Sequence, residues 1–403
     1  MKDNYYFDNA ATTWPKPEPV YTFVDSFFRS HGVNPGRASH QLAVEAETMV
    51  AETRRMLAQF FSFGGNVNRV VFSLNATDSL NTAIFGLVEP GGHMVMTRLE
   101  HNSVIRPANH LERDAGVGVA RVGGDGQGYV DPDDIRAAIT AKTKAVVVNH
   151  ASNVLGVVQD IAAIGRVVGE TDAAFVVDSC QTAGVLPIDM DALGIDILVF
   201  TGHKGLFGPM GIGGMIVREG IKVRPIRFGG TGVDSITPFQ PDIYPSHLEA
   251  GTQSLPGIAG LNAAQKWFAE LGNGDGDLGH GAVTRRALEK IFQAEEGHIN
   301  KLVDTFRAID GVKVYGPCGN RPRVSTMSIN IGSCPADQVG TMLDADYELC
   351  VRAGLHCAPL VHVDRGLLEQ NGAVRFSPGY FTDEEDMTRA IQGVRELAAT
   401  LTR

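Results

Sequence analysis

The sequence lacks three features that would each point to a particular class of protein: closely spaced cysteine pairs, long apolar runs and strongly basic clusters. Its five cysteines show no Cys-x-x-Cys spacing, which argues against a zinc site, and their odd number favours reduced thiols in the cytoplasm. No apolar run is long enough to cross a membrane or to form the core of a signal peptide. A net charge of -11 without a basic cluster argues against nucleic-acid binding. We therefore expect a cytoplasmic protein with no membrane or nucleic-acid partner.

The 403 residues are 43% apolar and 20% charged, which is typical of a globular protein with a large core and more than one domain. Between Val70 and Val217, short apolar runs alternate with helical patterns. This alternation predicts an α/β fold with a mainly parallel sheet and helices on both of its faces. A glycine-rich acidic stretch and the change of pattern after it predict a large domain at 15–270, a linker at 272–281, and a smaller α+β domain formed by 1–14 and 282–403.

Two ionisable residues follow apolar runs that are typical of buried strands. Asp178 ends the run 173–178, and Lys204 follows the run 197–200. Parallel strands bring such positions together at one edge of a sheet, where α/β proteins bind ligands. A buried lysine has a lowered pKa and acts as a nucleophilic amine, and a buried carboxylate needs a cationic partner such as a protonated pyridine nitrogen. The pair therefore predicts a site for pyridoxal 5'-phosphate (PLP), with Lys204 as the Schiff-base residue.

Other small or polar residues are expected at the same edge of the sheet. They are Ala76, His101, Asn153 and Gln181, with Thr201 and His203 beside Lys204. A helix that starts near Ala76 would offer free backbone N–H groups and its dipole to a phosphate, and Thr77 would add a hydroxyl. An ordinary helix N-cap is the alternative for this segment, and a structural histidine is the alternative for His101.

A second group of candidates lies near the end of the chain. Cys357 stands in a loop bounded by glycine and proline, beside His356 and five residues after Arg352. Cationic neighbours lower the pKa of a thiol, so Cys357 is the cysteine best placed to act as a nucleophile, with an incidental small apolar residue as the alternative. Arg375 lies on a short strand beside a glycine turn, where its guanidinium is suited to clamp a substrate carboxylate.

Four motifs together resemble one known family over nearly the whole chain. They are YFDNAATT at 6–13, VDSCQTAG at 177–184, FTGHKGLFGPMGIG at 200–213 and RAGLHCAP at 352–359. The chain resembles the fold-type I PLP enzymes of the class V aminotransferase group, and within that group the SUF-type branch of the cysteine desulfurases. The resemblance implies a mainly parallel, seven-stranded sheet with helices on both faces, together with a smaller α+β domain.

The resemblance also implies a role for each candidate residue. Lys204 would hold PLP and move protons, Cys357 would attack the substrate sulfur, and His101 would stack on the ring and act as an acid or base. The other implied contacts are Asp178 at the ring nitrogen, Asn153 and Gln181 at the ring hydroxyl and the substrate, Ala76, Thr77, Thr201 and His203 at the phosphate, Thr252 at the phosphate of the other subunit, and Arg352 and Arg375 at the substrate. Thr252 in particular implies a homodimer with shared active sites.

The implied reaction removes sulfur from L-cysteine, leaving L-alanine and a persulfide on Cys357 for transfer to an acceptor protein, for example in iron–sulfur cluster assembly. L-Selenocysteine is an alternative substrate, and C–S lyase and aminotransferase reactions are alternatives on the same fold. A catalytically silent scaffold with this fold is an alternative of another class. Three departures from the family leave the preferred substrate and the acceptor open: Cys180 in place of the common alanine, Leu355 in place of a polar residue, and APLVH at 358–362 in place of the usual pattern after Cys357.

Overall fold

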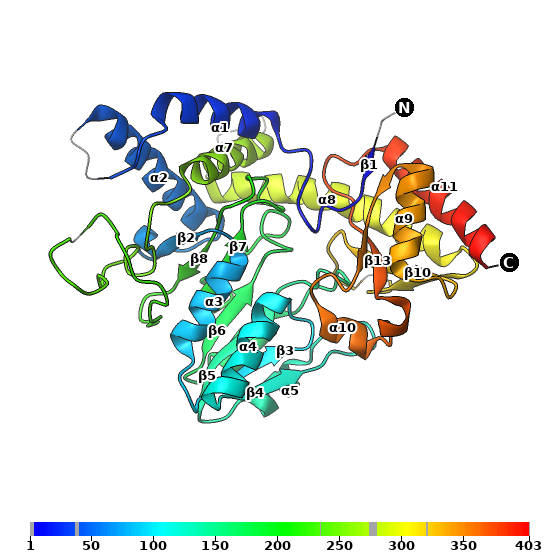
Figure 1. Cartoon of the computed structure of the whole chain (residues 1–403), viewed down its shortest axis with the longest axis horizontal. Coiled ribbons are helices and arrows are strands. Elements are labelled where there is room, and N and C mark those ends of the chain that lie inside the picture. The colour runs from blue at the N-terminus through cyan, green and yellow to red at the C-terminus, as the bar shows by residue number, and fades with distance from the viewer. Residues whose placement is uncertain (1–3, 37–39, 234, 274–279, 320, 403) are drawn as a thin grey trace.

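The computed structural model describes residues 4–36, 40–233, 235–273, 280–319 and 321–402. A large part is built on a seven-stranded sheet and a smaller part on a four-stranded sheet, and the smaller part contains both the first described strand and the last helix (Figure 1). Most of the predicted linker, residues 274–279, lies outside the described residues. Within the described ranges, no helix has the length and apolar character needed to cross a membrane.

The large sheet has the strand order β2-β8-β7-β6-β5-β3-β4. Its strands are β2 (Val70–Ser73), β3 (His93–Thr97), β4 (Gly118–Val122), β5 (Thr143–Asn149), β6 (Ala174–Asp178), β7 (Ile197–Thr201) and β8 (Gly213–Val217). β8 runs antiparallel to β2 and β7, whereas the other neighbouring pairs are parallel. β6 and β7 are buried along their whole length and β5 is buried except at Lys144, and their middle residues are apolar, as expected where both faces of a sheet are covered. The predicted mainly parallel sheet is confirmed.

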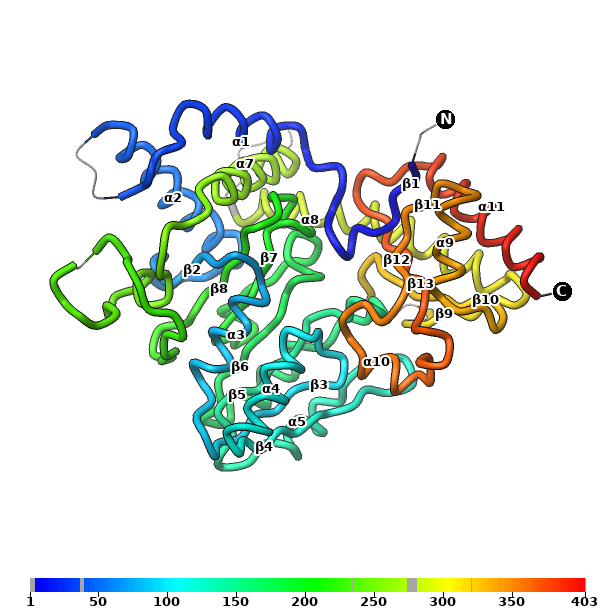
Figure 2. Tube along the Cα trace, in the orientation of Figure 1, coloured from blue at the N-terminus to red at the C-terminus, as the bar shows by residue number. Residues whose placement is uncertain are grey.

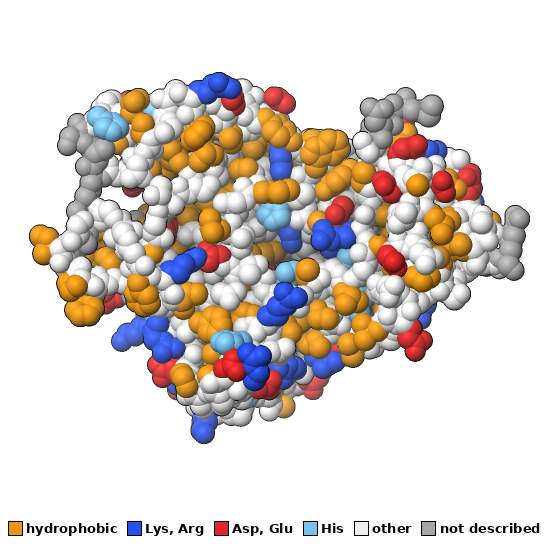
Figure 3. Space-filling model, in the orientation of Figure 1, with side chains coloured by type: hydrophobic (Ala, Val, Ile, Leu, Met, Phe, Trp, Pro, Cys, Tyr) orange, Lys and Arg blue, Asp and Glu red, His pale blue; other side chains and the backbone are white. Residues whose placement is uncertain are grey.

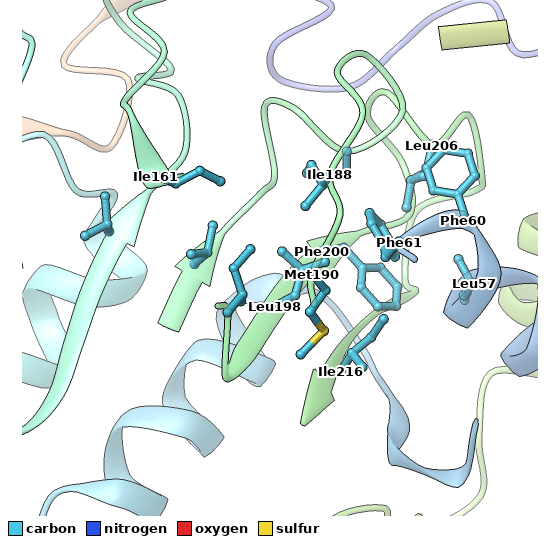
Figure 4. Close-up of a cluster of buried hydrophobic side chains, with 14 of the residues drawn as sticks. Leu57, Phe60, Phe61, Ile161, Ile188, Met190, Leu198, Phe200, Leu206 and Ile216 are labelled. Atoms are coloured by element: carbon cyan, nitrogen blue, oxygen red, sulfur yellow. The ribbon is translucent and has the colours of Figure 1, made fainter. Parts of the chain in front are cut away.

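Helices cover both faces of this sheet, as the sequence predicts. α3 (Ala76–Leu87) and α4 (Asn102–Ala115) pack on one face, and α2 (Gln41–Phe60), α5 (Pro132–Ala138), α6 (Ile161–Val168) and α7 (Leu255–Gly272) cover the other, with α1 (Glu18–His31) against α7. Neighbouring side chains of a strand point to opposite faces, so Val147 joins one core and Val146 the other. In the second core, Phe61 packs against Phe200, with Ile216 close by (Figure 4).

The smaller part has an antiparallel sheet with the order β12-β13-β10-β9. Its elements are β9 (Val312–Tyr315), β10 (Met327–Ile331), β12 (Arg352–Gly354), β13 (Ala373–Phe376), α9 (Ala336–Tyr347), α10 (Pro359–Asp364), the 3-10 helix η2 (Leu368–Gln370) and α11 (Glu384–Leu401). Another 3-10 helix, η1 (Val67–Arg69), precedes β2 in the large part. A parallel pair of β1 (Tyr5–Tyr6) and β11 (Leu349–Cys350) ties the N-terminal segment to this part. The predicted α+β architecture is confirmed.

One long helix, α8 (His280–Arg307), belongs to both parts and runs from one to the other (Figure 2). Leu288 near its start is buried in the core of the large part, whereas Leu302 and Phe306 near its end are buried in the core of the smaller part. The two cores are therefore joined by a continuous hydrogen-bonded helix. The domain boundaries expected from the sequence stay a prediction.

A buried ion pair anchors the irregular segment between β8 and α7. The guanidinium of Arg54 on α2 donates to both carboxylate oxygens of Glu249 at 2.7 Å, and the backbone N–H of Phe72 on β2 donates to the same carboxylate at 2.6 Å. Both side chains of the ion pair are almost fully buried. Removing one member of such a pair leaves the other as an unpaired buried charge, which is strongly destabilising.

We expect Glu249→Gln to destabilise the fold by about 3 kcal/mol or more, because the Arg54 charge would be left without its partner. The matched control is Glu170→Gln, which breaks an exposed ion pair with Arg136 and is expected to leave stability unchanged. Urea unfolding followed by circular dichroism measures both. Equal unfolding midpoints for the two variants would contradict the prediction.

Candidate active site

A cavity of about 230 Å³ lies at the carboxyl ends of the central strands, between the two parts of the molecule. Almost all the candidate residues predicted from the sequence line it: Ala76, Thr77, His101, Asn153, Asp178, Gln181, Thr201, His203, Lys204, Arg352, Cys357 and Arg375. Thr252 is exposed and is not among the lining residues of this cavity. The topology thus brings the residues of the sheet edge together with those of the C-terminal loop.

Lys204 and Asp178 form the charged floor of the cavity. Asp178 is the last residue of β6, and Lys204 follows the neighbouring strand β7, so the register of the sheet places them side by side at its edge. Burial lowers the pKa of Lys204, although the nearby Cys180 and Asp178 oppose this effect. One carboxylate oxygen of Asp178 accepts the backbone N–H of Cys180 at 2.9 Å. The site therefore offers a nucleophilic amine beside a carboxylate that is suited to a cationic partner.

His101 is the N-cap of α4 and provides a flat wall of the cavity. Its Nδ1 accepts the backbone N–H of Ser103 at 3.1 Å and lies 2.8 Å from the Ser103 hydroxyl, which in turn contacts the Thr77 hydroxyl at 2.7 Å. Burial and the nearby Lys204 lower the pKa of His101 to about 4, so the ring is neutral near pH 7. Ser103 was not expected from the sequence. A hydroxyl residue in the first turn of a helix was its only signal.

The start of α3 and the end of β7 together form a candidate anion-binding site. The Asn75 side chain caps the N–H of Asp78 at 3.0 Å, which leaves the first amides of the helix, those of Ala76 and Thr77, available for a ligand. The buried Thr201 hydroxyl and His203 Nδ1 have no hydrogen-bond partner among the described residues. Buried polar atoms are rarely left unsatisfied, so these atoms fit the oxygens of a bound phosphate.

The backbone around the candidate anion-binding site is also closely packed. A Cβ added at Gly213 on β8 would lie 2.8 Å from the carbonyl carbon of Asn75, which explains the glycine in the run after Lys204. The candidate phosphate-binding site, the buried Lys204 amine, the Asp178 carboxylate and the flat His101 ring are together suited to bind PLP. The site thus has residues suited to hold PLP in an enzyme of fold type I.

Cys357 stands on a loop with an unusual backbone. His356 and Cys357 both have left-handed conformations, with φ of 49° and 57°, which costs energy for residues other than glycine. Hydrogen bonds hold both carbonyls: the Asn153 side-chain amide donates to that of His356 at 2.6 Å, and the N–H of Asn102 donates to that of Cys357 at 2.7 Å. The loop therefore presents the exposed Cys357 thiol to the cavity from a fixed base.

Arg375 reaches the cavity from β13, but much of its hydrogen-bonding capacity is already used. It donates to the Asp8 carboxylate at 2.7 Å and to the Asn153 carbonyl at 3.1 Å, and its buried Nε has no partner among the described residues. Arg352 lies 3.7 Å from the same carboxylate. Asp8 was not expected from the sequence, although it lies in the motif at 6–13. A substrate carboxylate would have to bind alongside Asp8 or displace it.

Two further side chains differ in detail from what the sequence suggested. The Gln181 amide donates to the carbonyl of Ala10 at 3.1 Å, so it is partly engaged by the N-terminal segment. Burial and the neighbouring Asp178 raise the pKa of the Cys180 thiol well above its usual value, so this cysteine stays protonated. Within the described residues, no group of three or more His, Cys, Asp or Glu side chains could hold a metal ion.

The family model for aminotransferase class-V matches residues 5–389, and the chain belongs to this family. It is 31% identical to a probable cysteine desulfurase of Methanothermobacter thermautotrophicus, over 99% of this chain and 96% of the relative. A probable cysteine desulfurase of Pyrococcus abyssi is 30% identical over 98% of this chain and 94% of its own. The solved apo structure of a cysteine desulfurase from Thermococcus onnurineus superposes with a TM-score of 0.88 at 29% identity, covering 99% of this chain and 96% of that one.

Glu100 is a buried acid next to His101 that was also not expected from the sequence. One of its oxygens accepts the Thr97 hydroxyl at 2.7 Å and the N–H of Asn149 at 2.9 Å, and the other has no partner among the described residues. Burial, with a smaller contribution from Asp178, raises its pKa from 4.5 to about 8. The carboxyl is therefore neutral near pH 7.

We expect Glu100→Gln to flatten the dependence of stability on pH. Between the unfolded pKa of 4.5 and the folded pKa of about 8, the folded protein holds a proton that the unfolded chain has lost. Stability therefore falls as pH rises through this window and is lowest above about pH 8. Urea unfolding at about pH 5, 7 and 9 measures the slope for both proteins. Parallel curves for the wild type and the variant would show that Glu100 ionises normally.

Proposed function

We propose that this protein is a PLP-dependent cysteine desulfurase that converts L-cysteine to L-alanine and forms a persulfide on Cys357. The observation that carries this proposal is the exposed Cys357 thiol on the rim of the same cavity that contains Lys204 and Asp178. Relatives named probable cysteine desulfurase match over nearly the full length of the chain. Bound PLP would supply an electron sink for negative charge that develops on the substrate carbon skeleton.

The residues of the cavity divide the remaining work. Asp178 would hold the ring nitrogen, and the phosphate would be held by Ala76, Thr77, Thr201 and His203. The amine of Lys204, whose pKa burial lowers, would take the proton from the substrate Cα and return a proton to Cα when alanine forms. His101, neutral near pH 7, would lie against the ring as a flat hydrogen-bonding wall.

The sulfur step belongs to Cys357. Its Sγ forms a bond to the substrate sulfur, the bond between that sulfur and the substrate Cβ breaks, and Cβ gains a proton to become the methyl group of alanine. Arg375 and Arg352, with Asn153, would hold the substrate carboxylate opposite the thiol. The outer sulfur of the persulfide is then transferred to an acceptor protein.

The alternative functions leave some of the residues in this cavity without a role. A plain aminotransferase or C–S lyase has no use for an exposed thiol over the cavity, and a silent scaffold has no use for a buried Lys204 beside Asp178. L-Selenocysteine stays an alternative substrate, because selenium and sulfur differ little in size and chemistry. Assignment to the SUF-type branch rests on the loop 352–359, and a cytoplasmic location rests on the five unpaired cysteines; both stay predictions.

We further propose a homodimer in which Thr252 contributes to the site of the other subunit. Thr252 is exposed and lies away from the cavity of its own chain. The segment before it carries large apolar side chains on the surface, among them Ile236 at 96% and Phe239 at 78% exposure. The loop between β8 and α7 extends at the left-hand edge of the molecule in Figure 1, and apolar side chains gather at the same edge in Figure 3. Exposed apolar groups of this size are typical of a surface that a partner covers.

We expect Cys357→Ala to lower sulfide and alanine release from L-cysteine, with a reductant present, by at least about 100-fold. The absorption band of bound PLP should persist, because Cys357 is not among the residues expected to hold the cofactor. Cys318→Ala is the matched control, since Cys318 is also an exposed cysteine, and should keep full activity. If Cys357→Ala remained as active as the wild type, the protein would be better described as a C–S lyase or aminotransferase.

We expect Lys204→Ala and Thr252→Asp to complement each other when mixed. Each variant alone should be impaired, because the first lacks the amine and the second places a negative charge beside the phosphate. In a hybrid dimer with shared sites, one site carries both changes and the other neither, so random exchange should restore about a quarter of wild-type activity. If Thr252 serves its own chain, no hybrid contains an intact site and mixing restores nothing.

A further inference from the structure

A second, smaller cavity adjoins the active site. It shares Ala10, Cys180, Gln181 and Lys204 with the larger cavity, and Glu295 from the middle of α8 forms part of its opposite wall. Its volume is about 30 Å³, which is enough for one or two water molecules. Lys204 therefore borders two spaces, one on the side of Cys357 and one on the side of α8.

Glu295 makes no hydrogen bond or ion pair with any side chain or backbone group in the described part of the chain. Its side chain is half-buried because it lines this cavity. Burial raises the pKa of the carboxyl to about 8, so it holds a proton near pH 7. Lys204 and Cys180 are the ionisable side chains that share the cavity, and on α8 itself the nearest are Glu296 and His298.

The position of Glu295 matters because Lys204 is enclosed by protein and must still exchange protons. A substrate in the larger cavity would cover Lys204 from that side. Water in the smaller cavity would then still reach Lys204, and Glu295 is the carboxylic acid that lines this cavity. A protonated carboxyl that lines the same cavity as a buried amine is an arrangement that general acid–base catalysis uses.

We propose that Glu295 is a positioning residue that holds a proton and exchanges it with Lys204 through water in the smaller cavity. The proposal rests on the proposed desulfurase function and extends it to the supply of protons. Overall, L-cysteine and the Cys357 thiol give L-alanine and the Cys357 persulfide. The Cβ–S bond breaks, the S–S bond forms, the Cys357 thiol releases its proton to solvent, and Cβ gains one proton.

The proton that Cβ gains comes from Glu295 by way of water and Lys204. Water at the smaller cavity then returns a proton to Glu295, so that protons and charge balance over the cycle. Because Glu295 acts through Lys204, its loss should slow proton transfer and leave substrate binding unchanged.

The test compares Glu295→Gln with Glu296→Gln, an exposed acid at the next position of α8. We expect Glu295→Gln to lower kcat for alanine formation about tenfold with KM unchanged. The ratio of wild-type to variant kcat should shrink as the pH rises through about 8, where the wild-type carboxyl loses its proton. Glu295→Asp should recover part of the rate, and Glu296→Gln should behave as wild type.

A second measurement separates this proposal from the desulfurase function. Exchange of the Cα hydrogen of L-alanine with D₂O, followed by NMR, reports proton transfer by Lys204 without any sulfur chemistry. We expect Glu295→Gln to slow this exchange about tenfold, whereas Glu296→Gln should leave it unchanged. If L-cysteine released no alanine while this exchange depended on Glu295, the desulfurase function would fail and the proton role would stand.

A third measurement needs no cofactor. Infrared difference spectra of the cofactor-free protein between about pH 6 and pH 10 should contain, in addition to the band of Glu100, a C=O band of a protonated carboxylic acid that Glu295→Gln removes and Glu296→Gln keeps. The proposal is overturned if that band is absent from the wild type near pH 7. It is also overturned if Glu295→Gln exchanges the alanine hydrogen as fast as the wild type.

Discussion

The site depends on one lysine amine that is enclosed inside the protein. The end of β7 places Lys204 in an enclosed cavity, and burial lowers its pKa more than the neighbouring Asp178 raises it. The same burial leaves His101 and His203 neutral near pH 7. These two histidines therefore contribute hydrogen bonds and no charge. The charged side chains of the cavity, such as Asp178 and Arg375, then determine where the charged groups of a ligand bind.

A second requirement is that two separately packed cores meet at this amine. The large part provides Lys204 and Asp178, whereas the smaller part provides Cys357 and Arg375. α8 and the N-terminal segment connect the two parts, so their packing sets the separation between the amine and the thiol. Substitutions in the core around either end of α8 are thus expected to change the distance between the Lys204 amine and the Cys357 thiol.

Sequence reasoning identified most of the cavity because its signals are local. Asp178 and Lys204 each follow an apolar run, and the parallel sheet brings the ends of those runs together. Asp8 was missed because its partner Arg375 is 367 residues away, which no local pattern records. Glu100 and Glu295 were missed because a carboxylate in a sequence suggests a solvated surface, and only packing reveals that it is buried.

The anchored loop at His356 and Cys357 determines how sulfur can leave the site. Both carbonyls accept hydrogen bonds, from the side-chain amide of Asn153 and the backbone N–H of Asn102, so these bonds would have to break before the loop backbone could move. A persulfide would lengthen this side chain by about 2 Å, the length of an S–S bond. The outer sulfur therefore reaches no further from the loop backbone than the length of one side chain. An acceptor protein must bring its own nucleophile to the mouth of the cavity.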